Sequence, residues 1–200
     1  MANTTYLQDY FFGKMYEELF APEYAKNSNM LVIGDHSWPI EIHKGNTYNL
    51  NAAFQENFVT SMAVIPAEST AGRDHYRIRT EVSSLRSYLD IVPTVMEMYG
   101  ISQKNYYGKS FFKDFGGDGS SVGDKRCVVS VQPFSGGYIA VVNYPIKHIF
   151  DLRKGIVTVY NLGEDPNEMN PVQEAKIKPE HLDLLEGCLR SLRDKSVNPN

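Results

Sequence analysis

Hydrophobic positions along the first part of the chain predict a helix followed by a buried strand. Residues 5–20 repeat an apolar side chain every four positions, the spacing of a helix that faces a core, and the stripe consists of Leu7, Phe11, Met15 and Leu19. The uninterrupted apolar run from Met30 to Ile33 then indicates a buried strand. Gly34 follows it directly and allows the backbone to turn sharply at the strand's end.

Polar stretches separate this strand from the next apolar elements. Residues 38–57 are polar, studded with aromatics and without clear periodicity, as expected of a long loop over a site. A second strand-like run extends from Phe58 to Pro66, and residues 67–76 are expected to form another loop. The Gly-, Asp- and Ser-rich residues 115–121 are expected to form an exposed turn, because no Lys-Ser/Thr pair follows them as in a phosphate-binding loop.

The second half of the chain predicts a helix, an antiparallel sheet and a closing helix. Asp90 as N-cap, Pro93 in the first turn and Gly100 at the stop delimit a helix over residues 90–99. Apolar runs separated by turn residues predict an antiparallel meander, with strands near residues 128–131, 138–142, 147–150 and 156–160. The final helix, over residues 180–192, is expected to pack through a stripe formed by Leu182, Leu185, Leu189 and Leu192.

The composition is that of one sizeable globular domain. The 200 residues are 42% hydrophobic, which is enough to bury a core, and no long linker divides them. The net charge of −4 and the lack of a basic block argue against nucleic acid as a partner. No apolar run approaches the ~18 residues of a membrane span, and the first residues lack the pattern of a signal peptide.

The two cysteines are too few to indicate a disulfide framework. Cys127 lies in a strand-like run and Cys188 on a helix, and both fit the behaviour of small buried apolar residues. A single bridge between them is the alternative.

Asp35 and His36 are the clearest candidates for chemistry. They follow the first strand directly, at the edge where open α/β sheets place their ligands. A carboxylate and an imidazole suit a divalent ion such as Zn²⁺ or Mn²⁺. The structural alternative is a capping aspartate beside a turn histidine, and the dipeptide alone does not decide between the two.

Further landmarks follow Asp35 and His36 in order. They are the segment Leu89–Ile101, the run Tyr107-Gly108-Lys109-Ser110, and the segment Val159–Glu168 with its Asp-Pro-Asn-Glu end. This series resembles the C-terminal half of sulfatases of the alkaline phosphatase-like superfamily, in which a Gly-Asp-His metal motif is followed by LDIxPTLLxLxGI, YxGxSL and LYDLxxDPxE. Residues Tyr10–Leu19 resemble the helix that precedes the metal strand in that family.

The resemblance implies an α/β fold: the C-terminal part of an alkaline phosphatase-like α/β sheet, with a small antiparallel C-terminal sheet and a closing helix. It predicts that residues 1–200 form a single domain. Residues 1–112 are expected to contribute to the main sheet, and residues 113–200 to form the small sheet and the final helix.

The resemblance also implies a metal-dependent hydrolase or transferase that acts on sulfate or phosphate esters. Asp35 and His36 match the family's late pair of metal ligands, for Ca²⁺, Mn²⁺, Zn²⁺ or Mg²⁺. The basic pair His43-Lys44 is expected to contact the anionic oxygens of the ester. The Asp-His pair fits both sulfatases and phosphoglycerol or phosphoethanolamine transferases, and Ser37 departs from the glycine that usually follows it in either group. Proteins of this family are commonly exported or membrane-tethered.

A nucleophile is not recognisable in the sequence. It contains no Cys-x-Pro-Ser-Arg motif, and no acidic strand end with a Ser or Thr nucleophile precedes Asp35. The chain is therefore predicted to be inactive by itself, with no catalytic residue assigned and an incomplete metal site. The alternative is a non-catalytic binding or regulatory module that retains the half-fold. Because half a sheet leaves unpaired edges, self-association or a partner that supplies the N-terminal half is expected.

Overall fold

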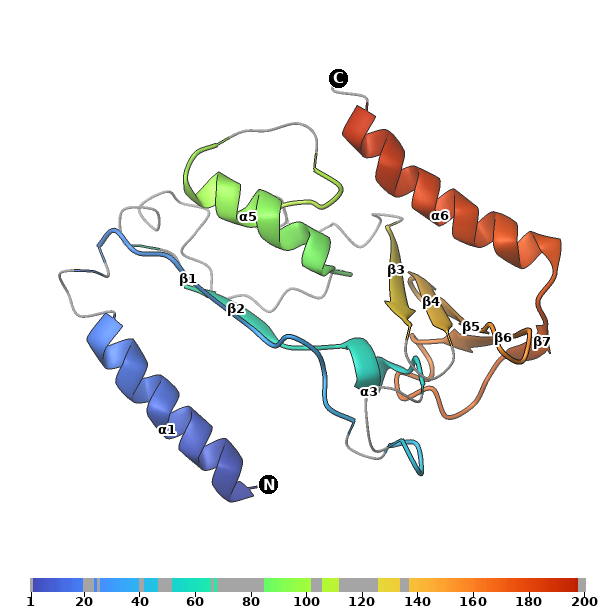
Figure 1. Cartoon of the computed structure of the whole chain (residues 1–200), viewed down its shortest axis with the longest axis horizontal. Coiled ribbons are helices and arrows are strands. Elements are labelled where there is room, and N and C mark those ends of the chain that lie inside the picture. Colours follow the sequence, from blue (N-terminus) through green and yellow to red (C-terminus); the bar gives the residue numbers. More distant parts are fainter. Residues whose placement is uncertain are drawn as a thin grey trace. The chain divides into compact units, whose positions relative to one another are not determined.

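The chain packs as two compact units, each built from two segments of the sequence. The computed structural model describes residues 2–19, 24, 26–39, 42–46, 52–65, 67, 85–101, 106–111, 126–133 and 137–197. The first unit comprises Met1–Val32 and Met62–Glu81, and the second comprises Ile33–Ser61 and Val82–Asn200. The loop predicted at residues 115–121 lies outside the described residues, and so does the loop predicted at residues 67–76 except for Ala67. Figure 1 labels the elements of both units.

The described residues of the first unit form a long helix and a two-stranded sheet. Helix α1 extends over Ala2–Leu19, and strand β1 (Met30–Ile33) pairs with β2 (Met62–Ile65). The side-chain oxygen of Asn29 accepts a hydrogen bond from the backbone N–H of Ala67 at 2.8 Å, which ties the segments beside the two strands together. The predicted helix and the first predicted strand are confirmed.

The apolar stripe of α1 is present but is not buried. Its members, Leu7, Phe11, Met15 and Leu19, are 51%, 65%, 45% and 54% exposed. On the polar side, Lys14 and Glu17 form an ion pair at 2.8 Å. The expectation that the stripe packs on a core is wrong for the described part of the first unit, because no described element of that unit covers this face. A stripe of apolar residues shows which face of a helix is suited to burial, but not what buries it.

The second unit is built on an antiparallel sheet in the order β3-β4-β5-β6-β7. Its strands are β3 (Cys127–Gln132), β4 (Tyr138–Asn143), β5 (Ile146–Asp151), β6 (Ile156–Asn161) and β7 (Gln173–Lys176). The four predicted strands are confirmed. Strand β7 was not predicted, because its sequence Gln-Glu-Ala-Lys lacks an alternating apolar pattern; it pairs with β6 as an edge strand.

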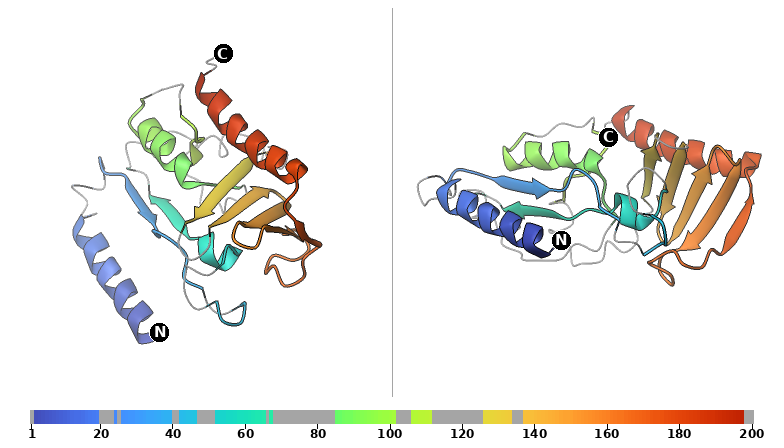
Figure 2. Two further views of the ribbon diagram at one scale, coloured as in Figure 1. Left: turned by 45° about the vertical axis from the view of Figure 1, so that its right-hand side comes forward. Right: turned by 60° about the horizontal axis from the view of Figure 1, so that its bottom comes forward.

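Alternate residues of this sheet face two different cores, as the pleat of a strand requires. On one face, Val141, Phe150 and Val157 pack with Leu185 and Cys188. Both of the latter belong to α6 (Pro179–Val197), which lies across the sheet in both views of Figure 2.

The opposite face is covered by the segment that contains the short helix α3 (Gln55–Phe58). Ala140, Ile149 and Tyr160 pack there with Ala53 and Phe54. From the sequence, this segment is predicted to be a loop, and the second predicted strand is expected to begin at Phe58. The sheet therefore has the closing helix α6 on one face and the segment that contains α3 on the other.

Helix α6 packs through a stripe that shares Leu185 with the predicted one but is rotated away from Leu182 and Leu189. Leu182 and Leu189 are 50% and 49% exposed, whereas His181 and Cys188 are buried. Cys188 forms a disulfide with Cys127 at the start of β3, with the two Cα atoms 5.5 Å apart. The interpretation of the cysteines as two unpaired buried residues is wrong and the alternative of one bridge is correct. Their meeting depends on the packing of α6 on β3, which spacing along the sequence does not encode.

A buried carboxylate holds the turn that precedes α5 (Ile91–Met98). Asp90 ends the 3₁₀ turn η2 (Tyr88–Asp90) and is fully buried. Its carboxylate accepts hydrogen bonds from the backbone N–H groups of Ser87 and Lys109, at 3.0 and 2.7 Å. Both terminal nitrogens of Arg126 donate to it at 2.6 Å. Asp90 occupies the predicted N-cap position, but its side chain makes no capping bond to α5 and instead joins three segments.

Gly108 allows the segment Tyr107-Gly108-Lys109-Ser110 to approach the turn before α5 closely. A Cβ at Gly108 would lie 1.9 Å from the carbonyl oxygen of Leu89, so only glycine fits at this distance. The hydroxyl of Thr94 donates to the Asp90 carbonyl at 2.6 Å and accepts from the Phe111 N–H at 3.0 Å. The two sequence segments around Asp90 and Gly108 therefore pack against each other and are linked by hydrogen bonds.

Candidate functional site

Asp35 and His36 lie directly after β1, in the second unit, where the sequence predicts them. Both side chains face solvent, since that of Asp35 is 89% exposed and that of His36 is 51% exposed. Asp35 Oδ2 and His36 Nε2 are 3.6 Å apart. Asp35 Oδ1 accepts the His36 backbone N–H at 3.0 Å, which orients the carboxylate toward the imidazole.

This pair of donors fits a single divalent ion. Two ligand atoms at about 2.1 Å from a tetrahedral ion lie about 3.4 Å from each other, close to the 3.6 Å that separates Asp35 Oδ2 from His36 Nε2. His36 Nδ1 lies 2.8 Å from the carbonyl oxygen of Ser37. A carbonyl only accepts, so this contact requires a proton on Nδ1, and in the neutral tautomer of this kind the lone pair is on Nε2.

The turn at Gly34 is held from two sides. Its N–H donates to the Ser61 carbonyl at 3.3 Å, and its carbonyl accepts from the Tyr88 hydroxyl at 2.5 Å. A Cβ at Gly34 would lie 2.1 Å from Thr60 Oγ1, so a larger residue cannot enter without displacing Thr60. Burial, aided by the nearby charge of Asp35, raises the pKa of Tyr88, which keeps its hydroxyl a donor.

Asp35 and His36 alone are too few to hold a metal ion firmly. Within the described residues, no three His, Cys, Asp or Glu side chains come close enough together to hold a metal ion. A firm zinc site takes three or four protein ligands. The pair is therefore suited to contribute to a metal site but does not complete one.

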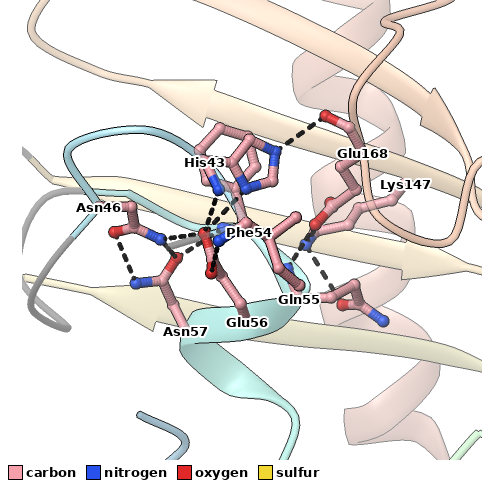
Figure 3. A network of polar contacts seen from close by, with 9 residues as sticks. His43, Asn46, Phe54, Gln55, Glu56, Asn57, Lys147 and Glu168 are labelled. Carbon is pink, nitrogen blue, oxygen red and sulfur yellow. Dashed lines mark hydrogen bonds and ion pairs between the residues drawn. The ribbon is translucent and has the colours of Figure 1, made fainter. Parts of the chain in front are cut away.

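His43 and Lys44, the predicted anion-binding pair, differ in their surroundings. Lys44 is exposed. The His43 ring stacks on Phe54 with centroids 3.5 Å apart, and its two nitrogens lie 2.8 Å from Glu56 Oε1 and 3.0 Å from the Glu168 carbonyl oxygen (Figure 3). Both partners are acceptors, and only the imidazolium donates from both nitrogens. Contact of His43 with an ester oxygen would require one of these bonds to open, so that contact stays a prediction for both residues.

Glu56 holds the loop beside α3 by accepting several hydrogen bonds from it. Its carboxylate accepts from the backbone N–H groups of Ile42 and His43, from the His43 ring and from the Asn46 amide, at distances between 2.6 and 3.1 Å (Figure 3). The Asn57 side-chain oxygen accepts from the Phe54 N–H at 3.1 Å. Burial raises the pKa of Glu56, but the hydrogen bonds from Asn46 and His43 outweigh burial and hold it below its ordinary value.

A buried ion pair closes the other side of this network. Lys147 Nζ lies 2.6 Å from Glu168 Oε1, and neither side chain is exposed. Lys147 also donates to the Gln55 side-chain oxygen at 3.2 Å, and the Glu168 carboxylate accepts the Gln55 backbone N–H at the start of α3. Burial lowers the pKa of Lys147, with the charge of Glu168 opposing it. Glu168 has a φ of +57°, uncommon for a residue with a side chain, so its contacts hold an unfavourable backbone.

The network forms one wall of an open pocket of about 400 Å³ within the second unit. Trp38, Ile42 and Val59 supply apolar surface to the pocket, and Ser37 and Asn167 supply polar groups. The Trp38 ring centroid lies 6.4 Å from that of His36. The pocket therefore opens beside the candidate metal ligands.

Sequence reasoning pointed to His43 but missed most of the network around it. Lys147 did carry a signal, because it shares a sheet face with the buried Ile149, where a lysine needs a buried carboxylate partner. Glu168 closes the Asp-Pro-Asn-Glu landmark, although the landmark does not reveal its partner. Glu56 and Asn46 lie in a segment without periodicity, and no local pattern distinguishes them.

Comparison with known proteins places the fold. No protein-family model matches the sequence, and no curated protein matches it significantly. The structure is similar to that of BT4656, solved in complex with its substrate D-glucosamine-2-N,6-O-disulfate, with a TM-score of 0.62 and 14% identity over 93% of this chain and 38% of that chain. It is also similar to a candidate sulfatase from Bacteroides thetaiotaomicron VPI-5482, with a TM-score of 0.63 and 18% identity over 87% of this chain and 39% of that chain.

These likenesses concern only part of each sulfatase. The chain spans about two fifths of the length of the two solved proteins. Identities this low carry the fold and not the activity. The mixed α/β architecture, with its antiparallel sheet and closing helix, and the resemblance expected from the ordered landmarks are both confirmed. The chain has the fold of part of a sulfatase.

Proposed function

We propose that this chain is the C-terminal portion of a metal-dependent hydrolase that acts on sulfate or phosphate esters. The observation that carries the proposal is the Asp35–His36 pair, whose Oδ2 and Nε2 lie 3.6 Å apart at the end of β1. The tautomer selected by the Ser37 carbonyl supports it, and so does the sulfatase fold.

In this proposal, Asp35 and His36 bind the metal ion, and the neighbouring residues position them. Asp35 and His36 hold a divalent ion, which when bound lowers the pKa of a nucleophilic hydroxyl and offsets the charge of the ester oxygens. Ser37 keeps the His36 ring in the ligating tautomer. Tyr88 and Thr60 fix the turn at Gly34 and with it the direction of both ligands.

We assign the nucleophile and the remaining metal ligands to a part of the sulfatase fold that these 200 residues do not span. The chain corresponds to 38% of BT4656, so most of that fold lies outside it. The exposed stripe on α1 and the two-stranded sheet of β1 and β2 are surfaces that such a part would cover.

Lys44 is the group we propose for direct contact with the anionic oxygens of the ester. It is exposed and charged, and it follows the pocket-lining His43 in the sequence. His43 then contributes chiefly by holding this loop between Glu56 and Glu168. Because BT4656 is bound to a sulfated amino sugar, we propose a sulfated sugar as the substrate class.

Metal binding by the purified chain tests the proposal without requiring turnover. Mn²⁺ should broaden the His36 resonances in an NMR titration, and Asp35→Ala and His36→Ala should each weaken this binding strongly. Glu174→Ala removes an exposed carboxylate on β7 and should leave binding unchanged.

Two outcomes would contradict the proposal. Mn²⁺ binding that persists in both variants would show that the ion sits elsewhere. No binding by the chain, even when the rest of a sulfatase fold is supplied, would favour a non-catalytic binding or regulatory module.

A further inference from the structure

We infer that the pocket beside Asp35 and His36 is a subsite for an uncharged sugar ring, with Trp38 as its stacking platform. The inference rests on the proposed function, because it names the part of the ester substrate that lies next to the metal pair. It goes further in assigning the chemistry of the pocket and the residue on which recognition depends.

Trp38 provides the first argument. Its side chain lines the pocket, the residue is 54% exposed, and its ring centroid lies 6.4 Å from that of His36. An indole is large, rigid and mostly apolar, so covering its exposed face with a ligand removes considerable apolar surface from water. The C–H face of a pyranose ring is flat and apolar and matches such a platform.

The charges in the pocket wall provide the second argument. Glu56 is bonded to His43 and Glu168 is paired with Lys147, and the two carboxylate side chains are 3% and 0% exposed. Each carboxylate turns toward its own partner, so the described lining residues present no unpaired charge to the pocket. A wall of this kind offers little to a sulfate or phosphate group and suits a neutral ligand.

The remaining lining residues are partly apolar and partly polar, which suits a sugar ring with its apolar faces and its hydroxyl groups. Ile42 and Val59 are 36% and 57% exposed and add apolar surface. Ser37 and Asn167 also line the pocket, and a serine hydroxyl and an asparagine amide can each donate to and accept from ring hydroxyls. A volume of about 400 Å³ accommodates one monosaccharide unit.

The fluorescence of the chain itself reports on the pocket, because Trp38 is the single tryptophan. Titration of the full chain with N-acetylglucosamine, which is neutral, should give a saturable change in tryptophan emission that added NaCl does not weaken. Inorganic sulfate should give no such change.

Variants then test the role of Trp38, with binding followed by saturation-transfer NMR on the sugar protons. Trp38→Ala should weaken N-acetylglucosamine binding by at least about tenfold, while Trp38→Tyr retains an aromatic face and should lose less. Tyr144→Ala removes an exposed aromatic from the turn between β4 and β5 and should change nothing. Matching melting temperatures for the variants would confirm that folding is not the cause.

The outcomes separate this inference from the proposed function. Sugar binding that is unchanged in Trp38→Ala, or sulfate that saturates the pocket as well as the sugar does, would overturn the subsite. These titrations contain no metal and measure no turnover. Sugar binding without Mn²⁺ binding at His36 would therefore contradict the metal site alone, and Mn²⁺ binding without sugar binding would contradict the subsite alone.

Discussion

Single side chains position the Asp35–His36 pair from outside its own loop. Thr60 occupies the space that a side chain on residue 34 would need, and the Tyr88 hydroxyl binds the Gly34 carbonyl. The glycine is therefore required by a neighbour and not by its own backbone angles. Such contacts determine how firmly the two exposed side chains that we propose as metal ligands are held in place.

Gly34→Ala is expected to lower the free energy of unfolding by about 1–3 kcal/mol. The physical reason is the 2.1 Å approach of the new Cβ to Thr60 Oγ1. In the double variant Gly34→Ala/Thr60→Ala that oxygen is absent and the nearest atoms lie at 3.4 Å, so most of the loss should be recovered. Urea unfolding of the four proteins in this cycle measures the effect, and a double variant no better than the single one would exclude the clash as its cause.

The ionisation of Glu56 makes the loop around α3 sensitive to acid. Its pKa in the folded chain lies below the ordinary value of 4.5, so the unfolded chain binds more protons over this interval and stability falls as pH decreases. Its contribution is fully present above about pH 4.5 and is lost as pH falls through the lower folded value. The stability difference between the natural chain and Glu56→Gln should therefore be largest near neutral pH.

Thermal unfolding across the acidic range measures this difference. Glu186→Gln, which changes an exposed carboxylate on α6, serves as the control and should show a much smaller dependence. A gap between the natural chain and Glu56→Gln that stays constant down to strongly acidic pH would contradict the role of the charge.

At the scale of elements, buried charges join segments that are distant in the sequence. Asp90 and Arg126 connect the turn before α5 to the residue before β3, and Lys147 and Glu168 connect β5 to the turn that precedes β7. Each pair is surrounded by further hydrogen bonds, such as that from the Lys109 N–H to Asp90. A buried pair of this kind is costly to break from one side, because the remaining buried charge loses its nearest opposite charge.

Arg126→Met is expected to destabilise the second unit by about 3–5 kcal/mol. The Asp90 carboxylate would stay buried and lose both 2.6 Å bonds to the guanidinium. Arg190→Met provides the matched control, since Arg190 forms an exposed pair with Glu186 within α6 and should cost less than about 1 kcal/mol. Denaturant unfolding compares the two, and equal losses would show that burial of the Asp90 pair contributes little.

At the scale of the whole molecule, the chain exposes surfaces that a complete sulfatase fold would be expected to cover. The stripe of α1 includes Phe11 at 65% exposure, and among the described residues β1 pairs with β2 alone. No described helix is long and apolar enough to cross a membrane. Exposed apolar surface and sheet edges favour association with another polypeptide or with a second copy.

The purified chain should therefore self-associate in light scattering at high concentration. A second expectation is that it hydrolyses neither aryl sulfates nor phosphodiesters with Zn²⁺, Mn²⁺, Mg²⁺ or Ca²⁺, because no nucleophile is recognisable in its sequence. Phe11→Glu should reduce the association, whereas Tyr144→Glu changes an exposed aromatic of the second unit and should leave it unchanged. A monodisperse monomer would contradict the first expectation. Metal-dependent hydrolysis that disappears in His36→Ala would contradict the second and would mean that this chain carries its own nucleophile.

The sequence by itself determined the order and type of most elements and the location of the candidate metal ligands. Helical spacing predicts α1, and alternating apolar runs predict β3 to β6, because both periods are properties of neighbouring residues. Asp35 and His36 could be proposed from the sequence for the same reason, since a strand, a glycine and two donors follow one another directly.

Only the tertiary structure decided which distant residues meet. It paired Cys127 with Cys188, buried His181 in place of Leu182, and brought Lys147 to Glu168. None of these contacts leaves a periodic signal, because each depends on how the closing helix and the loops pack on the sheet. The pocket beside Trp38 is a product of that packing, assembled from loop segments more than a hundred residues apart in the sequence.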